Sequence, residues 1–358
     1  MVFLSVREAF AAQARSCRSL GSELTARVCQ TLGLVLNRDQ GPVARQVLDW
    51  PGDTSSAGDS VPLRLAGALH ALVLQGSAPV LARAYQRGDV EPGLLLETIA
   101  THQRFVLDWL DSPPQTNETG RAAAIIAAAR FLGASLPLEI SELGASAGLN
   151  LNWPSFDFQP QSGLNAADLD IYRQKIGVIL RPDWRGKAPP APVEWVVAEA
   201  AGVDLNPLDP SRDELRLLAY CWPDQPARLA RLRAALALAQ RQAAPVRAGD
   251  AAQWLGERLA RPAPGRLRFV YHTIAWQYFP PETQARCEAA LQRAGAAAMP
   301  EAPLAHFGME ADGAAPGAGL RLRLWNGAAQ GWDLGRADFH GRWIDWRPVA
   351  IDPAQAWP

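Results

Sequence analysis

The chain has 358 residues, of which 48% are hydrophobic and 20% charged, and its formal net charge is -1. A single hydrophobic core rarely grows beyond about 250 to 300 residues, so this length predicts two domains. The balanced charge provides no overall attraction to nucleic acid or to an anionic membrane, and we expect neither as a partner.

The amino-terminal stretch Met-Val-Phe-Leu-Ser-Val-Arg-Glu reaches charged residues too early for a secretory signal. No run of about 18 apolar residues, the length that a membrane span needs, occurs in the sequence. No two of the 4 cysteines have Cys-x-x-Cys spacing, and the histidines lack the spacing of metal ligands. The sequence therefore predicts a soluble, cytoplasmic protein with free thiols and no metal site, and it leaves the oligomeric state open.

Apolar residues recur with helical spacing from residue 5 to about residue 130. The clearest helical segments cover residues 22–35, 63–74, 94–110 and 121–132. No strand pattern stands out in this part of the chain. We therefore predict an all-α N-terminal domain over residues 1–130.

Beyond residue 130, short apolar runs alternate with helical segments. The runs lie at 136–141, 193–203, 244–248, 267–273 and 320–325, and the longer helical segments at 213–242 and 281–294. This alternation predicts an α/β domain over residues 131–358 with a Rossmann-like, mostly parallel sheet. Residues 320–325 alternate with period two before Asn326-Gly327, which predicts an antiparallel hairpin at the C-terminal edge. An aromatic-rich insertion at about 152–192 either forms a lid over the substrate or packs against the helical domain.

The segment Glu142-Leu-Gly-Ala-Ser-Ala-Gly-Leu-Asn150 has two incompatible interpretations. Gly144-x-Ser146-x-Gly148 alone is typical of the nucleophile elbow of an α/β-hydrolase. With Glu142 in front of it, the same loop is typical of a methyltransferase that binds S-adenosylmethionine.

S-adenosylmethionine carries a sulfonium and an ammonium group and no phosphate, so a carboxylate at Glu142 suits it. The same carboxylate would repel the pyrophosphate of a dinucleotide, and the spacing does not fit Gly-x-Gly-x-x-Gly. Gly144 permits an unusual backbone turn, and Gly148 leaves space for a close approach of the backbone to the cofactor. At Ser146 the loop needs only a small residue. Asn150 closes this predicted cofactor loop.

The next predicted strands end in further polar residues. Asp204, in Gly202-Val-Asp-Leu-Asn-Pro207, is the candidate partner of the ribose hydroxyls, with Glu199 as a rival. Asp250 and Ala251 follow the third strand, where a carboxylate can accept the adenine amino group.

The hydrolase alternative needs an acid and a histidine after Ser146 in the sequence. Asp250 with His272, or Asp250 with His340, provides that order. Because serine, aspartate and histidine are abundant, such a trio arises easily by chance.

Several strings together resemble a bacterial family of unknown function that is related to class I S-adenosylmethionine-dependent methyltransferases. They are residues 63–72, 142–150 and 202–209, Trp222-Pro-Asp-Gln225 with Arg228, and His340-Gly-x-Trp343-x-x-Trp346. The resemblance covers nearly the whole chain and implies the Rossmann-like fold, with no established reaction to carry over.

We therefore expect a methyltransferase that acts on a small-molecule acceptor, with a non-catalytic ligand-binding or interaction protein as a further alternative. His272 is the candidate general base, because the usual pKa of histidine suits proton removal near neutral pH; a structural, hydrogen-bonded histidine is the equally weighted alternative. Tyr271, Trp276 and Tyr278 are candidates for the acceptor pocket. Asp224 either contacts a polar substrate or belongs to a structural break.

Overall fold

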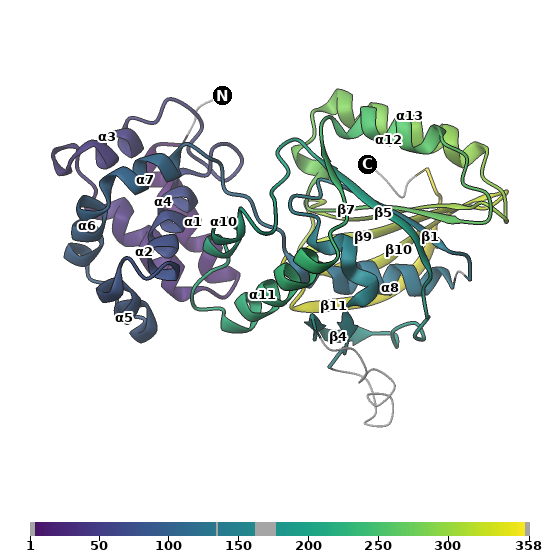
Figure 1. Ribbon diagram of the computed structural model, residues 1–358, viewed down its shortest axis with the longest axis horizontal. Coiled ribbons are helices and arrows are strands. Elements are labelled where there is room, and N and C mark those ends of the chain that lie inside the picture. Colours follow the sequence, from purple (N-terminus) through teal and green to yellow (C-terminus); the bar gives the residue numbers. More distant parts are fainter. Residues whose placement is uncertain (1–3, 134, 162–176, 355–358) are drawn as a thin grey trace. The chain divides into compact units, whose positions relative to one another are not determined.

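The computed structural model describes residues 4–133, 135–161 and 177–354 (Figure 1). Residues 162–176 of the expected insertion lie outside this part. The chain forms two compact units, which we call the helical unit (Met1–Thr116 and Arg212–Ala230) and the α/β unit (Asn117–Ser211 and Arg231–Pro358). Helix α8 (Ala122–Leu132), which the sequence placed at the end of the N-terminal domain, lies in the α/β unit.

The helical unit consists of short helices around a buried centre. Its described helices are α1 (Val6–Ser19), α2 (Glu23–Val35), α3 (Pro42–Leu48), α4 (Val61–Leu74), α5 (Pro79–Arg87), α6 (Pro92–Thr101), α7 (Gln103–Leu110), α10 (Glu214–Ala219) and the first residues of α11 (Pro226–Arg241). Helix α4 is apolar on nearly all sides and buried, as expected for a central core helix. None of the helices described meets alone the length and hydropathy of a membrane span; α4 and α5 do so only as a pair bent by 107°.

Two predicted helices are each divided in the structure. The segment predicted at 94–110 forms α6 and α7, which separate at His102. The segment predicted at 213–242 forms α10 and α11 on either side of Trp222-Pro223. Proline has no amide hydrogen and disfavours helix in the residue before it, which explains the second break.

The α/β unit is built on a sheet of 9 strands in the order β4-β11-β10-β9-β8-β7-β1-β5-β6. Its parallel part comprises β6 (Val246–Ala248), β5 (Val197–Asp204), β1 (Leu138–Leu143), β7 (Leu267–Thr273) and β8 (Leu304–Glu310). Its antiparallel part adds β9 (Ala318–Trp325), β10 (Ala329–Ala337) and β11 (Trp343–Ile351). The predicted mostly parallel sheet with an antiparallel edge is confirmed, but the edge is larger than a hairpin.

The sequence did not predict strand β8, which joins the parallel and antiparallel parts of the sheet. It has buried residues on both faces, so it lacks the alternation of a half-exposed strand. The described part of the insertion supplies β2 (Asp157–Phe158), β3 (Ile179–Leu180) and the edge strand β4 (Asp183–Gly186). Its Trp184 packs against Trp346 of β11, with ring centroids 5.6 Å apart.

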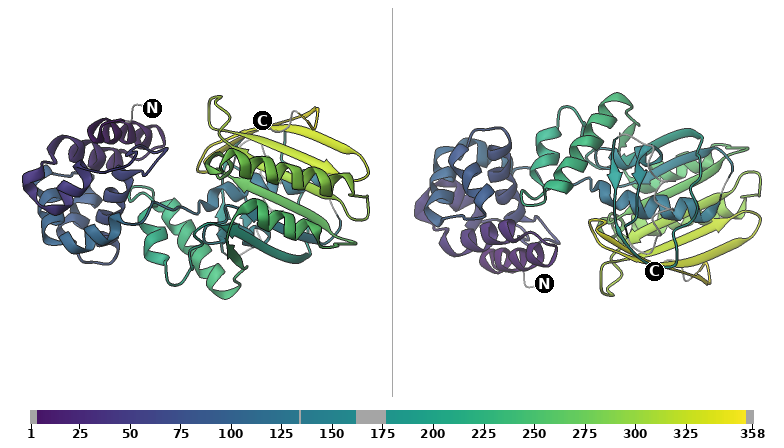
Figure 2. Two further views of the ribbon diagram at one scale, coloured as in Figure 1. Left: turned by 90° about the horizontal axis from the view of Figure 1, so that it is seen from above. Right: turned by 90° about the horizontal axis from the view of Figure 1, so that it is seen from below.

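Helices cover both faces of this sheet. Helices α12 (Ala251–Ala260) and α13 (Pro281–Ala296) lie side by side on one face, and α8 lies on the other (Figures 1 and 2). Side chains from β1, β5 and β7 form a buried cluster with α12 and α13. All 4 cysteines are buried and free, as the sequence predicted.

Candidate functional site

The strand order of the α/β unit reverses beside β1. From β1 the chain continues to β5 and β6 on one side, and later to β7 and β8 on the other. Ligands of open α/β sheets bind outside the carboxyl ends of the strands at such a reversal. The predicted residues from Glu142 to Asn150, together with Asp204 and the residues after His272, all occur at this edge, which makes it the candidate site.

The loop after β1 has an unusual backbone. Gly144, Ser146 and Gly148 have φ angles of 69°, 53° and 68°. A Cβ on Gly144 would lie 2.5 Å from the Cβ of Ala275 in the loop after β7, so only glycine fits there. Left-handed conformation is uncommon for serine and costs about 1 to 3 kcal/mol. The surroundings of Ser146 must therefore hold it in place.

Asp204 at the end of β5 supplies that restraint. Its Oδ2 accepts a hydrogen bond of 2.8 Å from the Ser146 amide, and its Oδ1 accepts one of 2.9 Å from the Asn206 amide. Asp204 is only partly buried. A carboxylate has about four acceptor positions, so two remain for ligand hydroxyl groups.

Glu199, the predicted rival for the ribose, lies five residues before Asp204 on the same strand. At about 3.3 Å per residue, the two are about 16 Å apart. Its Oε1 accepts hydrogen bonds from Arg258 (2.7 Å) and Arg261 (3.3 Å). The structure therefore removes Glu199 from the candidate site.

Glu142 is buried at the end of β1. Burial, the largest effect, raises the pKa of Glu142 well above its usual range, against the smaller opposing effect of a hydrogen bond with Tyr271. The Tyr271 hydroxyl lies 3.4 Å from Glu142 Oε2 and 3.1 Å from the carbonyl oxygen of Asn150. The Tyr271 hydroxyl is the donor to both the Glu142 carboxyl oxygen and the Asn150 carbonyl oxygen. Burial therefore works against the negative charge that the sequence predicts Glu142 to present to the cofactor.

Two buried polar atoms of the same loop have no hydrogen-bond partner in the described structure. They are Ser146 Oγ and Asn150 Oδ1, in residues that are 5% and 2% exposed. Most buried polar atoms are hydrogen-bonded, and an exception calls for an explanation such as a missing ligand. These two atoms are thus candidate ligand contacts.

His272 takes part in a buried chain of polar side chains on the other face of the sheet. Arg323 Nη2 lies 2.9 Å from His306 Nδ1, and His306 Nε2 lies 3.1 Å from His272 Nε2. Arginine only donates, so the proton of a neutral His306 is on Nε2 and is donated to His272. His272 then donates from Nδ1 to Glu310 Oε1, at 2.7 Å.

Both nitrogens of His272 are therefore hydrogen-bonded inside the protein, and the residue is 0% exposed. A general base has to reach the proton that it removes, directly or through one water. The structure thus supports the structural alternative for His272, and the assignment of this residue as catalytic base is corrected.

The loop after β7 is also strained. Ile274 has a φ of 50°, which is rare for a β-branched residue. Glu310 Oε1 accepts hydrogen bonds from the amides of Ala275 (3.0 Å) and Trp276 (3.1 Å) and so fixes this turn. Strained non-glycine residues thus occur in both loops beside the strand reversal, and such strain clusters at functional sites.

The predicted acceptor-pocket residues differ in their exposure. Tyr271 is buried, and Trp276 is 6% exposed and stacked on His272 with centroids 4.9 Å apart. Tyr278 is 62% exposed. Of the three, only Tyr278 is open to a ligand in this conformation.

Asp250 and Asp224 both stabilise helix ends. Asp250 accepts a 2.8 Å hydrogen bond from the Gln253 amide at the start of α12, and it also binds Thr283 and Arg286. Ala251 is the first, buried residue of that helix. Asp224 lies in the helical unit, where it accepts hydrogen bonds from the Ser22 hydroxyl and the Leu24 amide at the start of α2. The structural alternative for Asp224 is therefore the one that the contacts support.

Residues that the sequence did not single out support the loop after β1 and the end of β7. Asn117 Oδ1 accepts from the Leu149 amide (2.9 Å), and the Glu118 carbonyl accepts from Asn150 Nδ2 (3.3 Å). Arg121 Nη1 donates to the carbonyl of Thr273 at the end of β7 (2.9 Å). These residues come from Thr116-Asn-Glu-Thr-Gly-Arg121, whose composition resembles an ordinary surface turn. Asn117 and Glu118 are buried and Arg121 is partly buried, which the sequence does not reveal.

No group of three or more histidine, cysteine, aspartate or glutamate side chains in the described part of the chain is arranged to hold a metal ion.

Comparison with known proteins identifies one family. No curated protein and no solved structure matches the chain. A family model described as "Uncharacterized protein conserved in bacteria (DUF2332)" matches residues 7–346. The chain therefore belongs to this bacterial family of uncharacterized proteins.

Proposed function

We propose that the protein is a Rossmann-like, S-adenosylmethionine-dependent methyltransferase that acts on a small-molecule acceptor. The observation that carries the proposal is the position of Asp204. Its partly exposed carboxylate lies at the carboxyl end of β5, beside the strand reversal, and holds the amide of Ser146 in the loop after β1. A carboxylate at this point of a doubly wound sheet suits a ligand with ribose hydroxyls.

The residues present fit the cofactor in part. Asp204 has acceptor positions left for two hydroxyl groups, and within the described residues Ser146 Oγ and Asn150 Oδ1 are buried polar atoms without partners. Burial raises the pKa of Glu142 and so disfavours its charged form, whereas the carboxylate of Asp204 is only partly buried beside the same loop. No phosphate-binding set of arginines or lysines occurs among these loop residues, which agrees with a cofactor that has no phosphate.

When bound, S-adenosylmethionine supplies a methyl group on a positively charged sulfur. The protein's own contribution is then mainly geometric. The glycines of the loop after β1 permit a close approach, Asp204 orients the ribose, and the rigid ends of β1 and β7 fix the direction of transfer. Alignment of two reactants can contribute about 7 to 11 kcal/mol to a barrier, so catalysis on this basis needs no general base in the protein.

Calorimetric titration with S-adenosylhomocysteine tests the proposal. A ligand concentration of about 1 mM detects even a binding free energy near -4 kcal/mol. We expect heat from the wild type, clearly weaker binding for Asp204→Asn and loss of binding for Asp204→Ala. Asp333→Ala, which removes a partly exposed carboxylate from β10, is the matched control and should bind normally. No heat from the wild type would refute the proposal.

The serine-hydrolase alternative has one observation in its favour, the left-handed φ of Ser146 after a central strand. Against it, Ser146 Oγ has no hydrogen-bond partner in the described structure, so neither His272 nor Asp250 activates it. Labelling by a fluorophosphonate probe that is lost in Ser146→Ala would establish this alternative. The non-catalytic alternative would be favoured by binding of S-adenosylhomocysteine without methyl transfer to any acceptor in a broad panel.

A further inference from the structure

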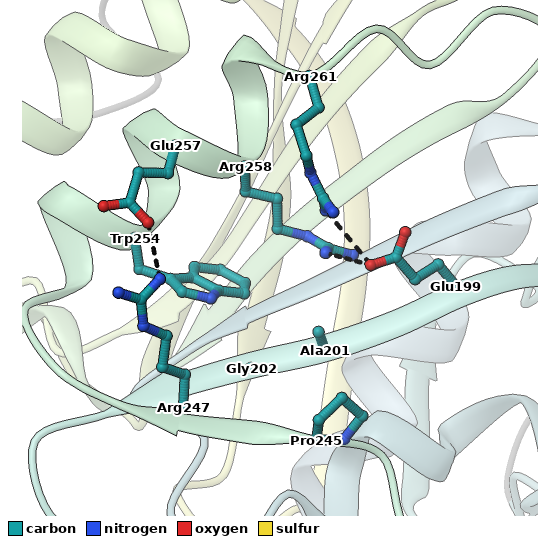
Figure 3. Close-up of a pocket in the computed structure, with 9 residues that line it drawn as sticks. All are labelled: Glu199, Ala201, Gly202, Pro245, Arg247, Trp254, Glu257, Arg258 and Arg261. Atoms are coloured by element: carbon teal, nitrogen blue, oxygen red, sulfur yellow. Dashed lines mark hydrogen bonds and ion pairs between the residues drawn. The ribbon is translucent and has the colours of Figure 1, made fainter.

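A cavity of about 300 Å³ lies in the α/β unit between β5 and helix α12 (Figure 3). Its wall includes Glu199, Ala201 and Gly202 of β5 and Trp254, Glu257 and Arg258 of α12. Arg261 and the residues Pro245 and Arg247 complete it. Along β5 the cavity wall extends from Glu199 to Gly202, and it includes neither Asp204 nor any residue of the loop after β1. Its lining residues therefore differ from those of the candidate cofactor site.

Apolar atoms form one part of the cavity wall. Figure 3 shows the indole of Trp254 between two groups of ion pairs, with Ala201 and Pro245 on the side of the sheet. The guanidinium of Arg258 stacks over this indole at 5.3 Å and is almost fully buried. An aromatic wall beside small side chains suits the flat face of a ring.

The charged part of the wall has an excess of positive charge. The carboxylate of Glu199 accepts from Arg258 and Arg261, and that of Glu257 accepts from Arg247 at 2.7 Å. The hydrogen bond from Arg258 lowers the pKa of Glu199, and hydrogen bonds from Gln253 and Arg247 lower that of Glu257, so both remain ionised. Three guanidinium groups thus face two carboxylates.

Arg258 and the other two arginines differ in how many of their donors are in use. Arg258 donates from all three nitrogens, to Ser141, Glu199 and Ile140. Arg247 and Arg261 each donate from one nitrogen to a carboxylate in the described structure, and their side chains are 58% and 55% exposed. Each guanidinium has five N–H donors, so both retain donors for a carboxylate or phosphate.

We propose that this cavity binds a small aromatic anion, a single ring with a carboxylate or phosphate group. The ring packs on Trp254 and the small residues of β5, and Arg247 or Arg261 at the cavity wall binds the anionic group. The volume is at the lower end of the range for ligand pockets, about 300 to 1,000 Å³, which limits the ligand to about one substituted ring.

Saturation-transfer NMR on the full chain tests this proposal with benzoate and phenyl phosphate at about 1 mM, where even dissociation constants near 1 mM are detected. We expect saturation transfer to both rings and little to the neutral benzyl alcohol. The double variant Arg247→Gln/Arg261→Gln should weaken binding about tenfold, because charge-assisted hydrogen bonds are lost.

Arg347→Gln is the matched control, because Arg347 is 70% exposed, pairs with Asp345 and lies on β11. Binding should also persist in Asp204→Ala and with excess S-adenosylhomocysteine, which separates this site from the proposed cofactor site. Three results would overturn the proposal: no transfer from either anion, equal transfer from benzyl alcohol, or unchanged binding in the double arginine variant.

Discussion

His272 of β7 and His306 of β8 face each other with their Nε2 atoms 3.1 Å apart, and both residues are 0% exposed. They form the centre of a chain that runs from Glu310 through both imidazoles to Arg323 and ends at Glu288 of α13. Arg323 of β9 is itself 1% exposed and donates to both oxygens of Glu288. This series of hydrogen-bonded side chains links β7, β8, β9 and α13. The two histidines therefore hold the ends of β7 and β8 in position.

The first prediction concerns His306 and pH. Burial, followed by the charges of Arg323 and His272, lowers the pKa of His306 well below 6.5. The unfolded chain takes up a proton near pH 6.5 and the folded protein does not, so stability is lost as the pH falls below that value. We expect this loss to be about 1.4 kcal/mol per pH unit until the folded pKa is reached.

Urea unfolding of the wild type and His306→Gln at pH 7.5, 6.5 and 5.5 measures this effect. The stability of the variant relative to the wild type should rise toward pH 5.5, even though the variant is less stable at pH 7.5. His102→Gln, which changes a partly exposed histidine, is the control. Parallel pH curves for the wild type and His306→Gln would contradict the prediction.

The second prediction concerns Glu142 and has the opposite sign. Burial raises the pKa of Glu142 well above 4.5, so stability is present below that pH and is lost as the pH rises toward the folded pKa. Glu142→Gln, which imitates the protonated side chain, should therefore gain stability relative to the wild type by about 1.4 kcal/mol per pH unit above 4.5. Thermal unfolding between pH 4.5 and 7.5 shows the gain, and the exposed control Glu282→Gln should show none. A pH-independent difference would mean that Glu142 is ionised in the folded state.

The third prediction concerns the contact between Gly144 and Ala275. Gly144 and Gly265 share a φ of 69°, but an added Cβ would lie 2.5 Å from Ala275 Cβ at Gly144 and meets nothing within 4 Å at Gly265. Gly265→Ala should cost only backbone strain, about 1 to 2 kcal/mol, whereas Gly144→Ala adds an overpacking cost of about 1 to 3 kcal/mol.

Ala275→Gly should recover the second part of that cost, because it removes the methyl group that clashes. A double-mutant cycle of the unfolding free energies measures the coupling. Equal losses of stability in Gly144→Ala and Gly265→Ala would show that the loop after β1 does not contact Ala275 in the loop after β7.

The fourth prediction separates Asp224 from ligand binding. Asp224→Ala removes the acceptor for the Ser22 hydroxyl and the Leu24 amide, so it should cost about 1 to 2 kcal/mol of stability. Asp49→Ala, which breaks an ion pair of two exposed side chains, should cost less than about 1 kcal/mol. Affinity for S-adenosylhomocysteine should be the same in both variants; a specific loss in Asp224→Ala would restore this residue as a ligand contact.

The sequence pattern predicted the sheet well where its periodicity was clear. The strands at 138–143, 197–204, 246–248 and 267–273 fall close to the predicted runs, and so do α2, α4 and α13. It missed α12, and it missed β8, which carries His306 and Glu310, because a strand buried on both faces has no alternation to detect. The sequence pattern also overlooked Asn117 and Arg121, because the polar residues next to them in the sequence are typical of a surface turn.

The sequence by itself determined the small residues of the loop after β1, the acidic end of β5 and the alternation of strands and helices, because these depend on local backbone geometry and on apolar periodicity. Only the tertiary structure decided what the polar groups do. It buried Glu142 and so raised its pKa, it joined His272 to His306 and Glu310, and it turned Asp204 toward the amide of Ser146. Ionisation and hydrogen bonding depend on burial and on partners that are distant in the sequence, which no local pattern contains.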